Sequence, residues 1–138
     1  KIEERLRKSN LRPTRARKKI MALFSDNTNH MSTEEIVKRV LSEDKDVGQA
    51  TVYQNVGLLA QSGVLTAFKG PEGILLHDSG GENHHHLICK KCGEITDVHI
   101  NGSADDLEPH PLGEGINLDG WDIKASTVEF YGLCPACK

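Results

Sequence analysis

The four cysteines of the chain form two close pairs, and each pair has the spacing of a metal-binding turn. Cys89 and Cys92 enclose two lysines, whereas Cys134 and Cys137 enclose a proline and an alanine. A turn of this length aims both sulfurs inward, so two such turns supply the four thiolates of a tetrahedral Zn²⁺ site. The 41 residues between the pairs exceed the roughly 15–20 residues of a zinc ribbon. We therefore expect a structural zinc site that joins the end of the chain to an earlier segment.

Two other uses of paired cysteines fit the sequence less well. Two disulfides are typical of a secreted protein, but the first residues are charged and show no secretory signal. A thiol-redox pair is typical of a thioredoxin-like βαβ unit, and no such pattern surrounds either pair. Zinc binding is the preferred interpretation of all four cysteines.

Three consecutive histidines, at positions 84–86, lead into the first cysteine pair. The segment is typical of a strand, on which alternate side chains share a face, so His84 and His86 point one way and His85 the other. Two imidazoles on one face are ready ligands for Fe²⁺, Mn²⁺, Zn²⁺ or Ni²⁺. Further candidate ligands close by in the sequence are His77, Asp78, Glu82, Asp97 and His99.

Helices followed by a hairpin are predicted in the first half of the chain. A short charged helix over residues 2–8 precedes a second helix that Thr14 can cap. Ser32 faces Glu35 three residues later, which is a capping box, so another helix begins there. Residues 49–62 have the apolar spacing of a further helix, which Gly63 ends. Segments 64–69 and 73–77 are predicted strands around a turn at 70–73.

This order of elements is typical of a winged helix-turn-helix, in which the last helix enters the DNA major groove and the hairpin contacts the backbone. The basic N-terminus would add phosphate contacts. The same elements also build modules with no DNA role, so the pattern alone leaves both interpretations open. Polar residues expected on the outward face of helix 49–62 are Gln49, Thr51, Tyr53, Gln54 and Asn55.

The second half of the chain is predicted to be mostly strand, with alternating segments at 84–89, 94–100 and 122–133. Residues 101–120 between them are rich in glycine, proline and aspartate. Within this segment, 104–108 has the pattern of one helical turn that Pro109 and Pro111 would end. The predicted fold class is therefore α+β. We expect a winged-helix domain over residues 1–76 and a small α/β metal-binding domain over 77–138.

Charge divides the chain at the same place. The net charge is −3, but residues 1–76 hold 13 basic and 9 acidic side chains, whereas residues 77–138 hold 4 basic and 11 acidic ones. A positive first half can meet an anionic polymer, and a negative second half can hold cations. The mean charge and the 4% aromatic content disfavour a polybasic or base-stacking nucleic-acid binder. No run of 18 apolar residues is present, so no transmembrane helix is predicted.

Taken together, these motifs resemble those of the ferric uptake regulator (Fur) superfamily of bacterial metal-dependent repressors, over nearly the whole chain. The matching segments are 11–14 (Leu-Arg-Pro-Thr) with Arg17, 50–55 (Ala-Thr-Val-Tyr-Gln-Asn), 84–93 and 131–137. The resemblance implies an N-terminal winged helix and a C-terminal α/β dimerisation domain with structural zinc. It also implies a homodimer that binds palindromic operators in double-stranded DNA. A cytoplasmic protein is implied, with no enzymatic activity, no membrane partner and no small-molecule ligand other than a metal ion and peroxide.

The resemblance also assigns roles to individual residues. The structural zinc ligands of the family match Cys89, Cys92, Cys134 and Cys137. The regulatory ligands, which hold Fe²⁺ or Mn²⁺ in the family, match His30, Asp78, His84, His86 and Asp97. Asp78 is chosen by spacing, and its neighbour His77 is the alternative. Tyr53 matches a residue that family members place against DNA, and the full predicted DNA-binding set is Arg12, Arg17, Gln49, Thr51, Tyr53, Gln54 and Asn55.

The branch of the family is indicated by a single ligand. Asp97 is typical of the peroxide-sensing branch, PerR, because iron-sensing Fur proteins usually carry glutamate there. Gln54 is typical of neither branch, and Ser126 stands where many Fur proteins have a histidine of an additional metal site. We therefore favour a PerR-like repressor that is released by metal loss or by oxidation of His30 or His86. An iron- or other-metal-sensing Fur-type regulator is the alternative.

Two other function classes stay open on the residues alone. A metalloenzyme could use the histidine cluster, although the sequence has no HExxH motif. A zinc-stapled protein-interaction module would need no DNA contact. Within the family, segment 109–120 is also unusual, because relatives usually have a longer dimerisation helix there, so we expect an altered dimer geometry.

Overall fold

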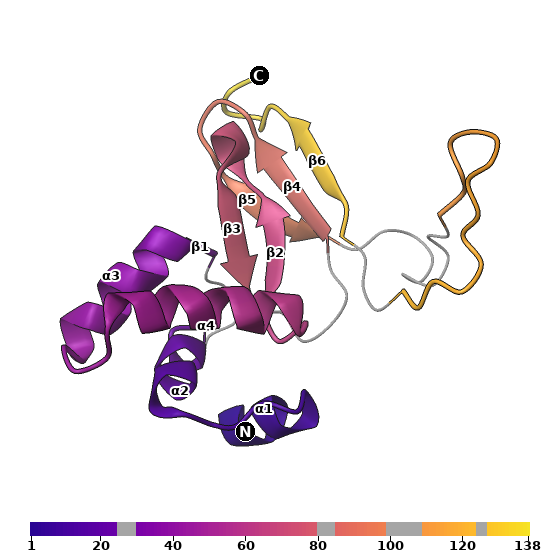
Figure 1. Ribbon diagram of the computed structural model, residues 1–138. Helices are drawn as coiled ribbons and strands as arrows, with labels where there is room; N and C mark the ends of the chain where they lie inside the picture. The colour runs from indigo at the N-terminus through magenta and orange to yellow at the C-terminus, as the bar shows by residue number, and fades with distance from the viewer. Residues whose placement is uncertain (25–29, 80–84, 99–108, 124–126) are drawn as a thin grey trace.

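The computed structural model describes residues 1–24, 30–79, 85–98, 109–123 and 127–138 of the chain. The α-helices gather at one end of the molecule and most of the strands at the other (Figure 1). The N-terminus lies at the helical end, and the C-terminus lies beyond the strands. Separate helices and mainly antiparallel strands make up the predicted α+β class. Among the described helices, none is long and apolar enough to cross a membrane.

The first two helices begin where the sequence predicts. Helix α1 spans Ile2–Lys8 and helix α2 spans Arg15–Ala22. The backbone N–H of Arg17 donates to Thr14 Oγ1 at 3.3 Å, which confirms Thr14 as the N-cap of α2. Phe24 lies just beyond the end of α2 and is buried.

The next two helices are bounded by specific local contacts. Helix α3 (Thr33–Glu43) begins at the predicted capping box, in which Glu35 N–H donates to Ser32 Oγ and Ser32 N–H donates to Glu35 Oε1. Helix α4 spans Gln49–Gln61. Gly63 follows it with a φ of +86°, a left-handed conformation that glycine adopts without steric cost.

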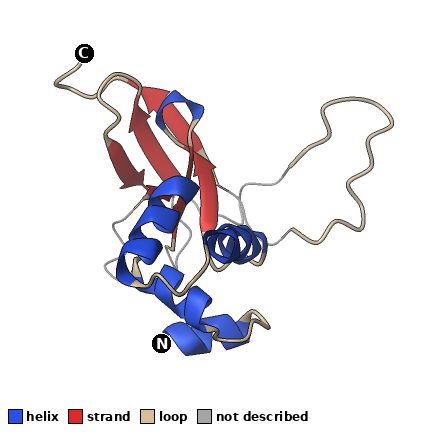
Figure 2. Cartoon of the chain, turned by 60° about the vertical axis from the view of Figure 1, so that its left-hand side comes forward, coloured by secondary structure: helices blue, strands red, loops and turns tan. Residues whose placement is uncertain are grey.

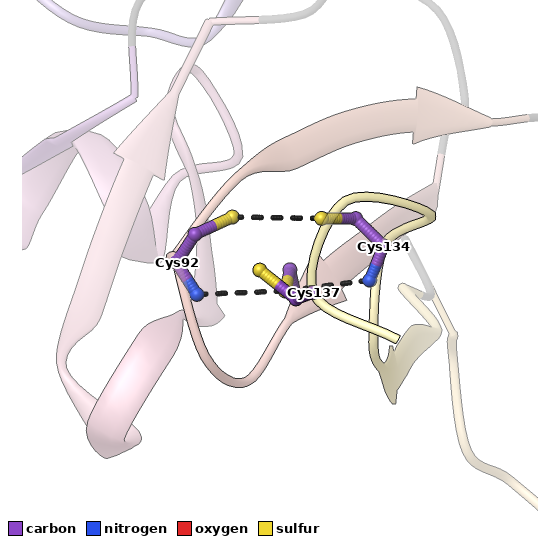
Figure 3. A group of neighbouring side chains, drawn as sticks. Cys92, Cys134 and Cys137 are labelled. Atoms are coloured by element: carbon purple, nitrogen blue, oxygen red, sulfur yellow. Dashed lines mark hydrogen bonds between the residues drawn. The ribbon is translucent and has the colours of Figure 1, made fainter.

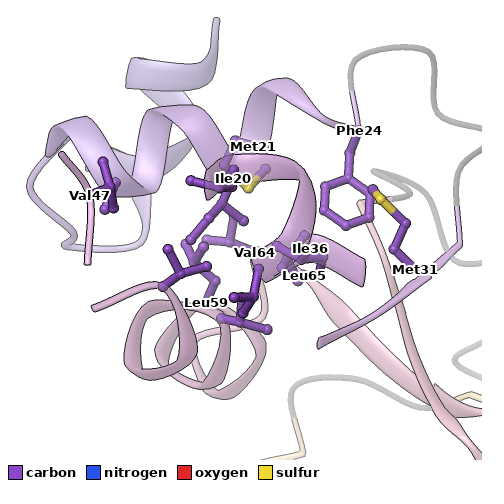
Figure 4. Close-up of a cluster of buried hydrophobic side chains, with 14 of the residues drawn as sticks. Ile20, Met21, Phe24, Met31, Ile36, Val47, Leu59, Val64 and Leu65 are labelled. Carbon is purple, nitrogen blue, oxygen red and sulfur yellow. The ribbon is translucent and has the colours of Figure 1, made fainter. Parts of the chain in front are cut away.

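The main apolar core lies between these helices. Ile20 of α2, Ile36 of α3 and Leu59 of α4 meet there with no exposed surface (Figure 4). Burying such a side chain contributes roughly 1.5–3 kcal/mol. The core therefore fixes α4 against the rest of the helical end and leaves its opposite face exposed.

The predicted hairpin is present, and an unexpected strand extends it. Strands β2 (Thr66–Lys69) and β3 (Leu75–Asp78) pair antiparallel around a short 3₁₀ turn, η1 (Pro71–Gly73). Strand β1 (Met31–Ser32) pairs with the other side of β3, so the sheet order is β1-β3-β2. A two-residue strand is too short to show alternation, which is why the sequence pattern does not reveal β1.

The second sheet is built from the C-terminal half of the chain. Strand β4 (His85–Cys89) pairs antiparallel with β5 (Ile95–Val98) and parallel with β6 (Glu129–Gly132). The strand predicted over 122–133 is wrong at its start, because residues 122–123 and 127–128 lie outside β6. The ladder of β6 reaches only as far as its partners in the short β4. Ile123 is exposed, and no strand among the described residues pairs with it.

A small apolar cluster lies between the two sheets. Phe68 and Leu76 of the first sheet pack with Ile88 of the second, and all three are buried. Because side chains alternate along a strand, Asp78 lies on the same face as Leu76, and His86 lies on the same face as Ile88. Polar residues of both sheets therefore converge beside a thin apolar contact.

Residues 109–123 form neither helix nor strand and stand away from both sheets in two views (Figures 1 and 2). Prolines and glycines account for this irregular conformation, as expected from the composition. Leu112 and Trp121 are exposed in this segment. The helical turn predicted at 104–108 lies outside the described residues. Strand β3 crosses the predicted domain boundary between residues 76 and 77, and that boundary stays a prediction.

Candidate metal centres and nucleic-acid interface

Two imidazoles and two carboxylates converge between the sheets, and we call His30, Asp78, His86 and Asp97 the His/Asp site. His86 Nε2 lies 2.9 Å from Asp78 Oδ2, and His30 Nε2 lies 3.1 Å from Asp97 Oδ1. The crossed pairs are longer, with His30 Nε2 3.9 Å from Asp78 Oδ2 and His86 Nε2 3.8 Å from Asp97 Oδ1. One donor atom from each residue thus lies within 4.8 Å of all the others.

Strand pairing explains how these distant residues meet. Met31 of β1 pairs with His77 of β3, so the preceding residue, His30, lies beside Asp78. In the other sheet His86 pairs directly with Asp97. Each sheet therefore contributes one imidazole and one carboxylate, and the packing of the sheets brings the two pairs together.

The His/Asp site fits a divalent transition metal. Neighbouring ligands on an ion about 2.1 Å away are separated by roughly 3.0–3.4 Å, close to the shorter distances here. Mixed imidazole and carboxylate donors suit Fe²⁺, Mn²⁺ or Zn²⁺. The side chain of His86 is fully buried, whereas that of Asp97 is 39% exposed, so the site opens to solvent on one side.

The geometry separates the two alternatives for the residue at the end of β3. Asp78 points into the His/Asp site, whereas His77 points to the opposite face of β3, where its Nε2 lies 3.1 Å from Thr33 Oγ1. Burial lowers the pKa of His77, although the Asp78 carboxylate acts in the opposite direction. A buried neutral imidazole held against α3 is a packing residue. The arrangement favours Asp78 as the ligand.

The predicted ligand His84 and the further candidates Glu82 and His99 lie outside the described residues. His85 is described, and the backbone N–H of Val128 donates to its Nδ1 at 2.9 Å. As the alternation predicts, His85 does not share the face of His86.

All four cysteines come together at the opposite end of the second sheet. Because β4 and β6 run parallel, the turns that follow them lie side by side, and Lys90 N–H donates to the carbonyl of Gly132. Figure 3 shows Cys92 on one turn facing Cys134 and Cys137 on the other. The Cys92 and Cys134 sulfurs are 3.8 Å apart. One edge of a tetrahedron with Zn–S bonds of about 2.3 Å is also about 3.8 Å.

Backbone groups prepare this cluster for thiolate chemistry. The N–H groups of Cys92 and Cys134 point at Cys89 Sγ, at 3.5 and 3.4 Å, and lower the pKa of that thiol to about 6. Cys137 lies against Cys134, and this contact raises its pKa to about 12. Four thiolates in so small a space repel one another unless a cation neutralises them. The arrangement therefore fits Zn²⁺, which binds thiolates tetrahedrally.

Helix α4 presents a polar face beside the basic N-terminal segment. Gln49, Thr51, Tyr53 and Gln54 are exposed on it, as the sequence predicts for a recognition helix. Asn55 differs, since its amide nitrogen donates to the carbonyl of Thr51 and its amide oxygen accepts a bond from Arg17.

Arg17 is the centre of this surface. Its Nε donates to Asn55 Oδ1 at 2.9 Å, and its Nη1 donates to the carbonyl of Arg12 at 2.9 Å. Two residues predicted separately to touch DNA therefore bind each other. Arg17 fixes the loop of Arg12 against α4, and Asn55 orients Arg17.

Comparison with known proteins places the chain in a family. The sequence profile of the ferric uptake regulator family matches residues 8–125. The chain belongs to this family. The ferric uptake regulation protein of Neisseria meningitidis is 30% identical over 135 residues, covering 96% of this chain and 90% of that protein. The peroxide-responsive repressor PerR of Staphylococcus epidermidis is 29% identical over 133 residues, covering 96% and 85%. Fur and PerR relatives are thus equally distant.

Solved structures share the fold at low sequence identity. The ferric uptake regulator of Pseudomonas aeruginosa with manganese has a TM-score of 0.69 at 22% identity, covering 97% of this chain and 98% of that one. Helicobacter pylori Fur, described as having three functional metal binding sites, has a TM-score of 0.68 at 20% identity, covering 99% and 91%. These matches support the predicted α+β fold. Family membership makes the chain a metal-responsive regulator by class.

Proposed function

We propose that the chain is a metal-dependent transcriptional repressor that binds palindromic operator DNA as a homodimer when its His/Asp site is loaded. The proposal rests on the fact that the four donor residues come from two different sheets. His30 and Asp78 come from the sheet attached to the helices, whereas His86 and Asp97 come from the zinc-bearing sheet. An ion held by all four would fix the helical end relative to the other sheet.

The thin apolar contact between the sheets makes such a switch effective. Among the described residues, the apolar contact between the sheets is a small cluster centred on Phe68, Leu76 and Ile88. Because this apolar contact is small, it holds the angle between the sheets only weakly. A metal ion that binds the closed arrangement more tightly can then shift the population of molecules toward it. Moving the equilibrium from 1:99 to 99:1 takes about 10⁴-fold tighter binding to the favoured state. In a dimer, the closed angle would set the spacing of two α4 helices on successive major grooves.

The two sites would have different roles and different metals. Zn²⁺ held by Cys89, Cys92, Cys134 and Cys137 would hold the turns after β4 and β6 together and keep the second sheet folded. Fe²⁺ or Mn²⁺ at the His/Asp site would be the regulatory ion, since nitrogen and oxygen donors suit both. The bacterial cytoplasm, where operator DNA lies, is the proposed place of action.

Peroxide sensing is the finer part of the proposal. Fe²⁺ held by these residues would activate peroxide to oxidise an imidazole ligand by two electrons, with one peroxide oxygen inserted into a ring C–H bond and the other leaving as water. The exposed side of Asp97 offers an approach for peroxide. The His30 and His86 rings lie at the same ion, so either would gain the oxygen. An oxidised imidazole ligates poorly, and the sheets would separate. Peptide mapping by mass spectrometry after peroxide treatment of the Fe²⁺-loaded protein tests this idea. If neither histidine gains an oxygen atom, the protein senses metal alone, as an iron-sensing Fur would.

A gel-shift experiment on a pool of inverted-repeat duplexes tests the main proposal. We expect retardation with Mn²⁺ and little without it. Alanine at His30 should abolish the difference, whereas alanine at His110, an exposed histidine of segment 109–123, should not. Absence of retardation in both conditions would favour a protein-interaction module. Turnover of a substrate by the loaded protein would favour a metalloenzyme.

A further inference from the structure

An aromatic side chain that the metal chemistry does not use packs against both histidines of the His/Asp site. Phe68 of β2 is 2% exposed and belongs to the small apolar cluster between the sheets. Its ring stacks on His86 with centroids 3.7 Å apart and planes 6° apart. The same ring meets His30 edge to face, with centroids 5.5 Å apart and planes at 86°. The His30 and His86 rings also lie nearly perpendicular, 5.7 Å apart.

We propose that Phe68 is a positioning residue of the His/Asp site, holding both imidazoles in the orientation that binds metal and strengthening their affinity for it. This inference deepens the proposed function and rests on metal binding at the site. Phe68 itself offers no ligand atom, so its action passes through His86 and His30.

The first effect of the ring is to restrict rotation. The second torsion of a histidine side chain is broad and only loosely constrained by its own stereochemistry. A phenyl face parallel to His86 blocks that rotation, because turning the imidazole would drive its edge into the stacked ring. His86 Nε2 therefore stays directed at Asp78 Oδ2, 2.9 Å away. The conformational entropy of the ligand is lost on folding rather than on metal binding, which favours the bound state.

The second effect is electrostatic, and the stacking geometry points to it. Two neutral aromatic rings prefer an offset or edge-to-face arrangement to a face-to-face one. Centroids only 3.7 Å apart in nearly parallel planes leave little lateral offset between Phe68 and His86. A metal ion withdraws electron density from its imidazole ligand, and an electron-poor ring is attracted to the negative face of a phenyl ring. The Phe68 stack is thus better suited to metal-bound His86 than to the free imidazole.

Phe68 also carries the effect across the sheet interface. It lies on the first sheet, whereas His86 lies on the second. Next to it, Tyr131 of β6 donates its hydroxyl hydrogen to the carbonyl of Lys69 at 2.7 Å. β2 therefore contacts the zinc-bearing sheet at two successive residues, Phe68 and Lys69. The Phe68 contact depends on the orientation of the His86 ring.

Substitution of Phe68 tests the inference on zinc-loaded, full-length protein. Phe68→Leu keeps an apolar side chain and removes the ring, whereas Phe68→Tyr keeps the ring face. Phe24→Leu is the matched control, because Phe24 is equally buried but lies in the main core. Mn²⁺ affinity is measured by competition with a fluorescent chelator, and Co²⁺ absorption bands report ligand geometry. Loss of Mn²⁺ binding and of the Co²⁺ bands in His30→Ala shows that both report on the His/Asp site.

We expect Phe68→Leu to weaken Mn²⁺ binding by about tenfold, as for other residues that orient metal ligands, and to change the Co²⁺ bands. Phe68→Tyr and Phe24→Leu should leave both close to wild type. Phe68→Met replaces the leucine variant if the circular dichroism of the metal-free leucine variant departs from that of wild type. Equal affinity in wild type and the ring-free variant, or an equal loss in Phe24→Leu, overturns the inference alone. If wild type binds no Mn²⁺ at this site, both the inference and the proposed function are overturned.

Discussion

His86 Nε2 lies 2.9 Å from Asp78 Oδ2, although the two residues belong to different sheets. Asp78 ends the hairpin that follows the helices, and His86 is the second residue of the strand that leads into the cysteine cluster. This contact and that of His30 with Asp97 join the sheet attached to the helices to the sheet that carries the cysteine cluster.

Replacing Asp97 with glutamate tests whether this ligand favours peroxide sensing. The added methylene shifts the carboxylate that now lies 3.1 Å from His30 Nε2. A displacement of this size slows a reaction on the order of tenfold or more. The glutamate nevertheless still offers a carboxylate ligand to the metal. We expect Asp97→Glu to retain Mn²⁺-dependent DNA binding and to lose DNA release by peroxide in the Fe²⁺-loaded protein. Unchanged release would assign the sensing chemistry to other residues.

Removing zinc should unfold the second sheet before the helices. Cys89 and Cys134 hold the ends of β4 and β6 together, and loss of a structural metal is among the changes that cost on the order of 4 kcal/mol or more. After chelation, hydrogen exchange should accelerate at residues 85–89 and 129–132 and stay slow in α3 and α4. Cys92→Ser should behave like chelated protein, and its exposed neighbour Lys91→Ala like wild type. Uniform exchange across all elements would contradict a local role for the zinc.

The ion pair of Arg15 with Asp44 should make the helical end sensitive to acid. Arg15 Nε donates to Asp44 Oδ2 at 2.6 Å. Burial alone would raise the pKa of Asp44. Hydrogen bonds from the Arg15 side chain and the Asp46 backbone N–H, with the positive charges of Arg15 and Lys19, outweigh it and lower the pKa below its usual 3.8. The stabilisation is therefore present above about pH 4 and is lost as pH falls through the lower folded-state pKa.

Urea unfolding of wild type and Asp44→Asn across this range measures that effect. The variant should be less stable at neutral pH, and the difference should shrink as pH falls below 3.8. Asp46→Asn is the control, because Asp46 is 85% exposed and lies 3.8 Å from Arg15. A difference between wild type and Asp44→Asn that does not vary with pH would show that the carboxylate charge is not responsible.

Arg17 and Asn55 should act on DNA as a unit. Because Asn55 orients Arg17 through a 2.9 Å hydrogen bond, removing either should disturb the same surface. A double-mutant cycle of Arg17→Ala and Asn55→Ala on operator affinity should give a coupling energy of about 1 kcal/mol. Gln54→Ala, on the exposed face of α4, should combine additively with Asn55→Ala. Additive losses for Arg17 and Asn55 would mean that each contacts DNA independently.

Local signals in the sequence predicted the elements well. Thr14 and the Ser32–Glu35 pair mark helix starts through contacts between residues three apart, so no long-range information is needed. The cysteine spacing likewise predicted the four-sulfur cluster. Strand β1 escaped detection because two residues carry no periodicity, and the strand over 122–133 was predicted too long because pattern alone does not show where its partner ends.

The composition of the His/Asp site depends on information that spacing does not carry. His30 reaches Asp78 only because β1 pairs with β3, and His86 reaches Asp97 only through the register of β4 with β5. The family resemblance supplied these residues, whereas the residues alone offered several carboxylates near the histidines. Phe68 was missed, although its place opposite Leu76 in the hairpin puts it on the face of Asp78. The available signal was an aromatic residue on the inward face of β2, two positions after Thr66, which pairs with Asp78.

If metal binding at the His/Asp site controls DNA binding, operator affinity must differ with and without Mn²⁺. Fluorescence anisotropy of a selected inverted-repeat duplex, at one fixed salt concentration, measures the Kd of zinc-loaded protein in both conditions. We predict that Mn²⁺ lowers the Kd of wild type and of His110→Ala by at least about tenfold, a typical coupling of 1–3 kcal/mol. His30→Ala should show the weak, metal-independent value in both conditions. The same Kd for wild type with and without Mn²⁺ would show that metal binding at the His/Asp site does not control DNA binding.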